Sequence, residues 1–211
     1  MQRYQKILSL DETLRADRYY FSRDRYAFVA ARGALRELLG RYLAKPPSEL
    51  AFDYGAYGKP SLRQDSPKLV MQFNVSHSRG LALMAFSWGL RLGVDVESIR
   101  QDIASEEIAA RFFSPKEVVE LHSLPQAMRA EGFFLCWTRK EAYVKAIGSG
   151  LQISLKSFHV SLTPSEPEHL ESADSEGWTL RSLRPGDGFV GAVVAEGKNW
   201  ELHCWDWTEK S

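Results

Sequence analysis

The order in which helices and strands are predicted constrains the fold of this 211-residue chain more than any other feature. Apolar residues recur every three or four positions over residues 9–41, which is typical of helices, and strand-like runs follow. The same succession then occurs a second time, although the sequence itself has no repeat. This order favours an α+β fold, a pseudodimer of two similar halves, each with helices packed on a small, mostly antiparallel sheet and with a ligand cleft between them. The predicted halves are residues 1–91 and 92–211, and the predicted strands are 69–75, 81–88, 90–96, 158–162, 178–183, 189–194 and 200–205.

Capping residues predict where the helices begin and end. Ser9 and Glu12 have the spacing of a capping box, and Ser114 followed by Pro115 is typical of a helix start. The other signals predict a helix over 24–39 that stops at Gly40, a helical piece over 103–112, and a long helix from Pro125 to residue 147, stopped by Gly148 and Gly150.

Three arginines, Arg25, Arg32 and Arg36, share one face of the helix predicted over 24–39, because they are spaced by seven and four residues. Such a stripe is most often a solvated basic face. The alternative is a stripe that faces an anionic ligand.

Charge and composition exclude some classes of protein. Lys plus Arg number 27 and Asp plus Glu number 27, so the chain lacks the global basic field that nucleic-acid binders use. No run of about 18 apolar residues occurs, which argues against a membrane span. The two cysteines, Cys136 and Cys204, lie far apart without a secretory signal. We therefore expect a cytoplasmic protein in which both are buried, reduced thiols.

The stretch GVDVES (93–98) reads as a strand, yet it carries Asp95 and Glu97. Because side chains alternate along a strand, both carboxylates point to the same face and repel each other. Some positive group must compensate them.

A second cluster lies in WTRKEAYVKAIGSG (137–150), where Trp137, Glu141 and Lys145 fall on one helix face at i, i+4 and i+8. The simplest interpretation is an exposed Glu–Lys pair, but the tryptophan favours a face that is partly buried or lines a cleft. Together with Asp95 and Glu97 the helix would supply a third carboxylate, and hard cations such as Mg²⁺ prefer oxygen ligands and bind substrate phosphates. Zinc is a poorer match, because the five histidines lack its ligand spacing.

Two further stretches suit an anionic ligand. Lys59 and Pro60 follow Gly58 in a tight turn that differs from a P-loop, and Ser76 and His77 end the strand FNVSH. A Ser–His hydrolase is not expected, because adjacent residues of an extended chain point apart and no nucleophile elbow surrounds them.

Several of these motifs occur in the order seen in Sfp-type 4′-phosphopantetheinyl transferases, and the chain resembles that family over residues 9–151. The motifs are the basic helix DRYAFVAARGALRELLG, GKP, FNVSH, GVDVE, RFFSPKE and WTRKEAYVKAIGSGL. The resemblance implies an enzyme that transfers the phosphopantetheine arm of coenzyme A to a serine of an apo acyl or peptidyl carrier protein and releases 3′,5′-ADP. It also implies a monomer with coenzyme A in the cleft between its halves.

The resemblance assigns a role to each matching residue. It implies that Asp95, Glu97 and Glu141 hold Mg²⁺ on the pyrophosphate. It implies that the phosphates are contacted by Lys145 with Lys140 nearby, by Ser76, by His77 close to the 3′-phosphate, and by Arg32, and that Lys59 and Pro60 border the adenine. The general base is left open between Glu117, in RFFSPKE, and Glu141.

The sequence departs from the family at its N-terminus. Family members carry a longer N-terminal stretch with a first strand before the helix at Ser9, so we expect that strand to be short or missing here.

Residues 98–113 are a candidate docking surface for the carrier, or their apolar side chains pack inward. The alternative functions are a non-catalytic binding module for coenzyme A or a carrier protein, and a structural α+β protein whose charged clusters are salt bridges.

Overall fold

The computed structural model describes residues 1–55, 58–63, 70–148, 153–164, 166–172 and 175–207. Its first half contains α1 (Gln2–Gln5), α2 (Leu10–Asp17), α3 (Ser22–Leu43), β1 (Phe52–Tyr54), β2 (Pro60–Leu62), β3 (Met71–Ser78) and β4 (Leu81–Trp88). Its second half contains β5 (Leu92–Ser98), α4 (Glu106–Phe112), α5 (Pro115–Ser123), α6 (Gln126–Ile147), β6 (His159–Val160), β7 (Leu170–Glu171), β8 (Trp178–Leu183) and β9 (Phe189–Glu196).

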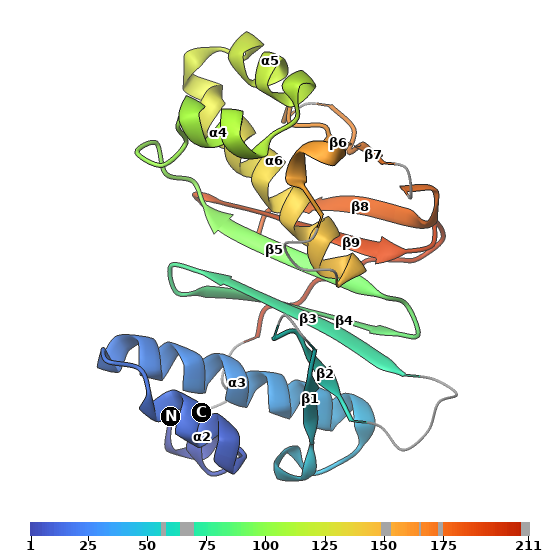
Figure 1. Cartoon of the computed structure of the whole chain (residues 1–211). Coiled ribbons are helices and arrows are strands. Elements are labelled where there is room, and N and C mark those ends of the chain that lie inside the picture. Colours follow the sequence, from blue (N-terminus) through green and yellow to red (C-terminus); the bar gives the residue numbers. More distant parts are fainter. Residues whose placement is uncertain (56–57, 64–69, 149–152, 165, 173–174, 208–211) are drawn as a thin grey trace.

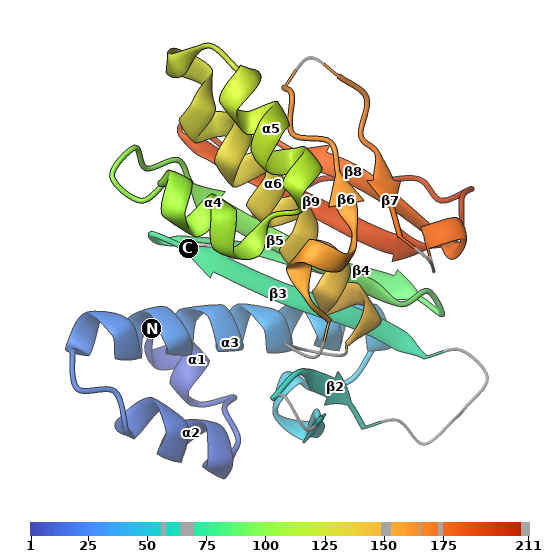
Figure 2. The ribbon, with the colours of Figure 1, turned by 45° about the horizontal axis from the view of Figure 1, so that its top comes forward.

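Each half packs one long helix on an antiparallel sheet, which confirms the predicted α+β class. In the first half α3 packs against β3 through Leu35, Leu39 and Phe73. In the second half α6 lies on the three-stranded sheet β5–β9–β8. Both helices are 22 residues long. Figure 1 shows α3 below β3 and β4, whereas α6 crosses one face of β5 and β9, as Figure 2 also shows, and β5 lies next to β3 between the two helices.

Gly93 explains how closely α6 approaches β5. A Cβ atom at this position would lie 2.2 Å from the carbonyl oxygen of Ala142 and 2.3 Å from the amide nitrogen of Ala146. Only glycine leaves room for the helix backbone to cross the strand at this distance. The first residue of GVDVE therefore brings Asp95 and the α6 face within reach of each other.

The two sheets meet along a row of hydrogen bonds that we name the polar seam. It consists of three β3 side chains, Asn74, Ser76 and Ser78, that accept hydrogen bonds from the backbone N–H groups of Val94, Val96 and Ser98 in β5 at 2.8, 3.4 and 3.3 Å. Alternate N–H groups of β5 face its partner β9, so these three belong to the open edge of the sheet. Polar side chains of the first half thus satisfy the edge strand of the second half.

Most predicted capping signals are confirmed. Ser9 and Glu12 form the capping box of α2, and Ser114 caps α5, where Glu117 completes a second box. Gly148 ends α6 in the left-handed conformation with φ 79°, while Gly150 lies outside the described residues.

The predicted stop at Gly40 is wrong, because α3 continues to Leu43 and ends at Ala44. A Cβ atom at Gly40 would lie 2.8 Å from the carbonyl oxygen of Lys45. The glycine therefore serves the close return of the chain after the helix and does not end it.

The arginine stripe is solvated only at Arg25, which is exposed, because Arg36 is 1% exposed and Arg32 is 8% exposed. Both guanidinium groups contact the buried carboxylate of Glu12, at 2.5 Å for Arg32 and 2.6 Å for Arg36. Glu12 comes from α2 and compensates the two positive charges inside the first half, which the helical pattern of α3 alone does not reveal.

The predicted strand over 200–205 is wrong. Within the described part of the chain, residues 198–207 form neither strand nor helix, and this segment runs from β9 back to the first half (Figure 1). There Trp207 packs with Tyr4, and Arg41 lies over the indole ring at 4.6 Å. The segment therefore packs on helices α1 and α3 of the first half and pairs with no strand of the described residues.

Three smaller expectations have clear outcomes. Cys136 is buried as predicted, but Cys204 is exposed, and both are free thiols. The residues before α2 form the short helix α1, which buries Tyr4, and no strand precedes α2 among the described residues. Among the helices of the described residues, none has the length and apolar character needed to cross a membrane.

Candidate active site

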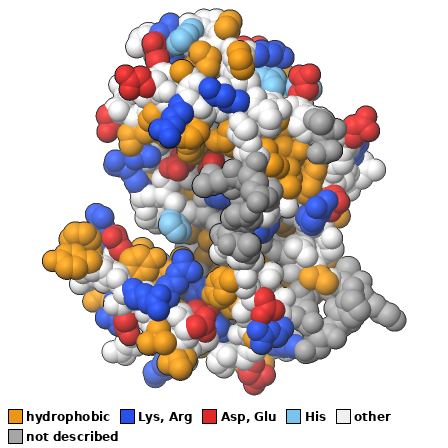
Figure 3. All heavy atoms as spheres, viewed as in Figure 1, with side chains coloured by type: hydrophobic (Ala, Val, Ile, Leu, Met, Phe, Trp, Pro, Cys, Tyr) orange, Lys and Arg blue, Asp and Glu red, His pale blue; other side chains and the backbone are white. Residues whose placement is uncertain are grey.

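Three elements bring six of the predicted site residues to one pocket between the halves. The pocket has a volume of about 350 Å³ and is lined by Val75, Ser76 and His77 of β3, Asp95 and Glu97 of β5, and Trp137, Glu141 and Lys145 of α6. The alternation of β5 and the helical spacing of α6 thus place both predicted clusters together. On the face drawn in Figure 3, basic side chains lie on both sides of the hollow between the halves.

Asp95 is the most deeply placed carboxylate of this pocket, with 4% of its surface exposed. Its Oδ1 accepts hydrogen bonds from Ser76 Oγ at 2.7 Å and from Lys145 Nζ at 2.6 Å. Its Oδ2 is buried and has no hydrogen-bond partner among the described residues. Asp95 therefore uses one oxygen for the protein and has the other available for a ligand.

Glu97 repeats this arrangement two residues later. Its Oε2 accepts a hydrogen bond of 2.7 Å from Ser78 Oγ and lies 3.7 Å from the guanidinium of Arg100. Each carboxylate of GVDVE is thus paired with a seam serine that also accepts a backbone N–H of β5.

Glu141 faces these carboxylates from α6. Burial raises the pKa of Glu141, the negative charges of Asp95 and Glu97 add to this, and Lys145 opposes it. The pocket therefore concentrates negative charge that Lys145 compensates only in part.

A divalent cation would fit this donor set. The unpartnered Oδ2 of Asp95 and the raised pKa of Glu141 both indicate that positive charge is lacking here. Within the described ranges, no three His, Cys, Asp or Glu side chains already stand as a metal-ligand set. In this structure Lys145 is the compensating group for Asp95, so a bound cation requires these side chains to rearrange.

Two predicted residues lie elsewhere. Glu117 and Lys140 form a buried ion pair of 2.8 Å, and both side chains are 0% exposed. Glu117 also accepts from the backbone N–H groups of Ser114 and Val160. Neither residue lines the pocket, so the structure separates Glu117 from the carboxylate cluster and gives it the geometry of a fold-stabilising residue.

The remaining predicted residues lie outside this pocket, and of them Lys59 contacts the other half. Lys59 Nζ donates to the carbonyl oxygens of Lys145 at 2.5 Å and of Leu92 at 3.4 Å, and burial lowers the pKa of this lysine. It thus caps the C-terminal turn of α6 from the other half. Pro60 begins β2, opposite Tyr54. Arg32 donates to Glu12 and to the hydroxyl of Tyr54.

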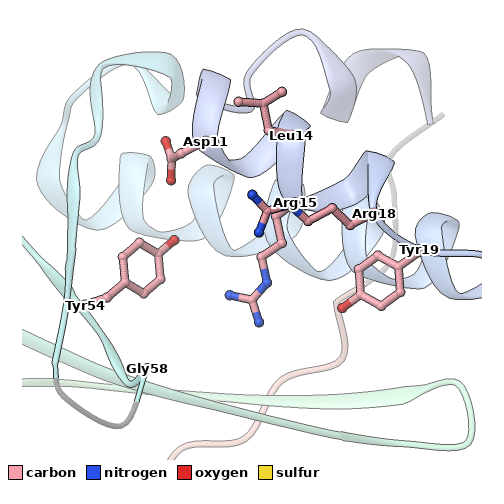
Figure 4. A pocket seen from close by; sticks show the side chains of 7 residues that line it. All are labelled: Asp11, Leu14, Arg15, Arg18, Tyr19, Tyr54 and Gly58. Atoms are coloured by element: carbon pink, nitrogen blue, oxygen red, sulfur yellow. The ribbon is translucent and has the colours of Figure 1, made fainter.

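A larger pocket of about 710 Å³ lies beside α2 (Figure 4). It is lined by Asp11, Leu14, Arg15, Arg18, Tyr19, Tyr54 and Gly58. Arg15 and Arg18 are exposed and make no ion pair among the described residues. Neither arginine belongs to a motif predicted from the sequence, although their spacing of three in LRADR places them on one helix face.

The apolar side chains of the candidate docking segment 98–113 pack inward. Ile99, Ile103, Ile108 and Phe112 are half-buried and pack against the core of the second half. The inward-packing alternative is therefore confirmed for these side chains.

Comparison with known proteins finds the same family for both halves of the chain. Residues 91–194 match the model of the 4′-phosphopantetheinyl transferase superfamily, and residues 1–88 match that of the 4′-phosphopantetheinyl transferase N-terminal domain. The 4′-phosphopantetheinyl transferase HetI of Nostoc sp. is 42% identical over 94% of this chain and 82% of that protein. The 4′-phosphopantetheinyl transferase Sfp of Bacillus subtilis is 29% identical over 92% of this chain and 84% of that protein.

Among solved structures, a holo-(acyl-carrier-protein) synthase from Bacillus anthracis in complex with coenzyme A (3′,5′-ADP) matches with a TM-score of 0.44 and 21% identity. The match covers 51% of this chain and 96% of that chain. The family models and the identity to HetI carry the assignment, since together they extend over both halves. The chain belongs to the 4′-phosphopantetheinyl transferase family and is an enzyme of that class.

Proposed function

We propose that this enzyme transfers the 4′-phosphopantetheine arm of coenzyme A to a serine hydroxyl of an apo acyl or peptidyl carrier protein, in a Mg²⁺-dependent reaction that releases 3′,5′-ADP. The observation that carries this proposal is the convergence of Asp95, Glu97 and Glu141 with Lys145 on one pocket. We place the reaction in the cytoplasm and expect the active form to be a monomer.

Asp95, Glu97 and Glu141 would hold Mg²⁺ through their oxygens. When bound, the cation supplies positive charge that neutralises the pyrophosphate and its leaving oxygen. The free Oδ2 of Asp95 and the charge repulsion around Glu141 support this assignment.

Lys145 is the residue that we expect to change partner. Its Nζ donates to Asp95 in this structure, and a cation would compensate Asp95 in its place. The ammonium would then donate to a pyrophosphate oxygen, while Ser76 keeps Oδ1 of Asp95 in position. His77, exposed at the edge of the pocket, would donate to a further phosphate oxygen.

The larger pocket is suited to the nucleotide end of coenzyme A. Arg15 and Arg18 offer two guanidinium groups for phosphate, whereas Arg32 is engaged by Glu12. Gly58 lines this pocket, so Lys59 and Pro60 follow directly at its border, which agrees with their proposed place next to the adenine.

In the proposed reaction the carrier serine oxygen forms a bond to the β-phosphorus, and the bond from that phosphorus to the bridging oxygen breaks, so that 3′,5′-ADP leaves. The serine proton must pass to a base. Of the two candidates, Glu141 lines the pocket, while Glu117 is sealed in an ion pair with Lys140. We therefore propose that Glu141 accepts the proton.

The test is incubation of the purified enzyme with an apo carrier protein, coenzyme A and Mg²⁺, followed by mass spectrometry of the carrier. We expect a mass increase equal to one phosphopantetheine group, and no increase when a chelator removes the Mg²⁺. Binding of coenzyme A without mass increase on any of several carriers would favour the non-catalytic binding module. Full transfer in the presence of chelator would reject the magnesium site.

A further inference from the structure

The polar seam joins the two halves at the point where the carboxylates stand. Ser78 belongs to β3 of the first half, and Glu97 belongs to β5 of the second. Ser78 Oγ accepts from the backbone N–H of Ser98 at 3.3 Å and donates to Glu97 Oε2 at 2.7 Å. Because the N–H can only donate, the hydroxyl proton of Ser78 is committed to the carboxylate.

We infer that Ser78 is a positioning residue for Glu97: it holds Oε2 in a fixed place and thereby leaves Oε1 for the cation. This inference rests on the proposed magnesium site. The backbone N–H of Ser98 fixes the hydroxyl, the hydroxyl fixes one carboxylate oxygen, and among the described residues no hydrogen bond engages the other oxygen.

Asp95 and Ser76 show the same geometry one step earlier in the seam, which supports this interpretation. Ser76 Oγ accepts from the N–H of Val96 at 3.4 Å and donates to Asp95 Oδ1 at 2.7 Å, and Asp95 Oδ2 has no partner in the described part of the chain. The period of two along β3 therefore matches the period of two in GVDVE, so each carboxylate meets one serine.

The seam also makes the positions of both carboxylates depend on how the two halves pack together. The serines come from one half and the carboxylates from the other, so the hydrogen bonds that hold both carboxylates depend on the contact between the halves. Ser78 differs from Ser76 in one useful respect. It does not line the pocket, whereas Ser76 does and receives a hydrogen bond from Lys145. Substitution of Ser78 therefore tests positioning without removing a group that faces substrate.

The test compares Ser78→Ala with Ser78→Thr, which keeps the hydroxyl, and with Ser87→Ala as the matched control. Ser87 lies on the neighbouring strand β4, is half-buried like Ser78, and donates one hydrogen bond of 2.7 Å to the Leu90 carbonyl, away from the carboxylates. Mn²⁺ is the probe for binding in the absence of carrier, followed by electron paramagnetic resonance, because carboxylate sites that suit Mg²⁺ also accept Mn²⁺. Transfer rates are measured as a function of Mg²⁺ concentration.

We expect Ser78→Ala to weaken Mn²⁺ binding and to raise the Mg²⁺ concentration for half-maximal rate by about 10-fold, since residues that orient a ligand typically contribute 10–100-fold in metal affinity. At saturating Mg²⁺ the kcat should return to within about twofold of wild type, because Ser78 does not touch the reactants. Ser78→Thr and Ser87→Ala should behave as wild type. If Ser78→Ala does not fold, Ser78→Cys removes the strong donor at nearly constant volume and takes its place.

Unchanged Mn²⁺ and Mg²⁺ dependence in Ser78→Ala would overturn the inference, as would a lower kcat that excess Mg²⁺ does not restore. Glu97→Gln separates this result from a failure of the magnesium site itself. If Glu97→Gln also binds Mn²⁺ as wild type does, the site is wrong. If Glu97→Gln loses the cation while Ser78→Ala keeps it, only the positioning role is wrong.

Discussion

Lys145 Nζ donates a hydrogen bond of 2.6 Å to Asp95 Oδ1, which joins α6 to β5 across 50 residues of sequence. The pair lies in the pocket that separates the two halves, and the second oxygen of Asp95 stays without a described partner. The lysine therefore compensates only part of the negative charge that Asp95, Glu97 and Glu141 concentrate there.

Loss of either deep carboxylate should abolish transfer while the fold remains. We expect Asp95→Asn and Glu141→Gln to reduce kcat/KM at least about 100-fold, because each removes a carboxylate that would hold the cation, and the cation would stabilise the negative charge of the transition state. Circular dichroism should show unchanged secondary structure. Glu201→Gln, at a side chain that is 89% exposed, is the control and should keep full activity. Full rates in both pocket variants would contradict the metal assignment.

The stability of the metal-free enzyme should depend on pH through Glu141. Burial, and then the charges of Asp95 and Glu97, raise the pKa of Glu141 in the folded state. The folded state therefore binds more protons than the unfolded state, so stability falls as pH rises from the ordinary carboxyl pKa through the raised one. Thermal unfolding in chelator should show Glu141→Gln to be more stable than wild type at neutral pH, with a difference that vanishes in acid. A wild type that is the more stable protein at neutral pH would reject this.

Gly93→Ala should destabilise the second half strongly. The added methyl group would lie 2.2 Å from a helix carbonyl oxygen and 2.3 Å from a helix amide nitrogen, and backbone atoms cannot move aside cheaply. We expect a loss of at least about 3 kcal/mol in the free energy of unfolding, measured by urea denaturation. The matched control is Gly186→Ala, where the methyl group meets nothing within 4 Å and the expected change is within about 0.5 kcal/mol.

Glu12→Gln should test the buried ion cluster of the first half. Glu12 compensates Arg32 and Arg36, and its removal leaves two buried positive charges. We therefore expect the free energy of unfolding to fall by about 3–5 kcal/mol. Burial by itself would raise the pKa of Glu12, but the two arginines outweigh it and hold the pKa below its ordinary value. The stabilisation is therefore present above the ordinary carboxyl pKa and disappears as pH falls through the lowered one.

The control for this cluster is Asp17→Asn on the same helix. Asp17 pairs with Arg25 at 2.7 Å, but both side chains are more than two-fifths exposed, at 49% and 44%. An exposed pair contributes at most about 1 kcal/mol. Equal losses in the two variants would show that Glu12 does not act as a buried counter-ion.

Trp207→Ala should release the C-terminal segment from the first half. The indole N–H donates to the Tyr4 hydroxyl at 3.4 Å, and the ring lies under the Arg41 guanidinium. Its removal should therefore lower the free energy of unfolding by about 1–3 kcal/mol and increase hydrogen exchange in residues 198–207. Trp205→Ala is the control, because that side chain is 72% exposed. Equal exchange in both variants would mean that Trp207 does not anchor the segment.

The sequence alone determined much of the local structure. Capping residues located the starts of α2 and α5 and the end of α6, because a cap depends on a few neighbouring residues. The spacings of two in GVDVE and of four in WTRKEAYVK also placed three carboxylates and Lys145 on faces that meet in one pocket. Regular secondary structure turns such spacings directly into shared faces.

The tertiary structure decided which charged residues face the cleft and which are sealed inside. Arg32 and Arg36 are buried because Glu12 comes from another helix, and Glu117 is buried because Lys140 and β6 surround it. The same holds for the seam, since Ser78 meets Glu97 only after two sheets have packed edge to face. Local spacing fixes the face on which a side chain stands, but the partner that neutralises it lies far away in the sequence and is specified only by the packing of the whole chain.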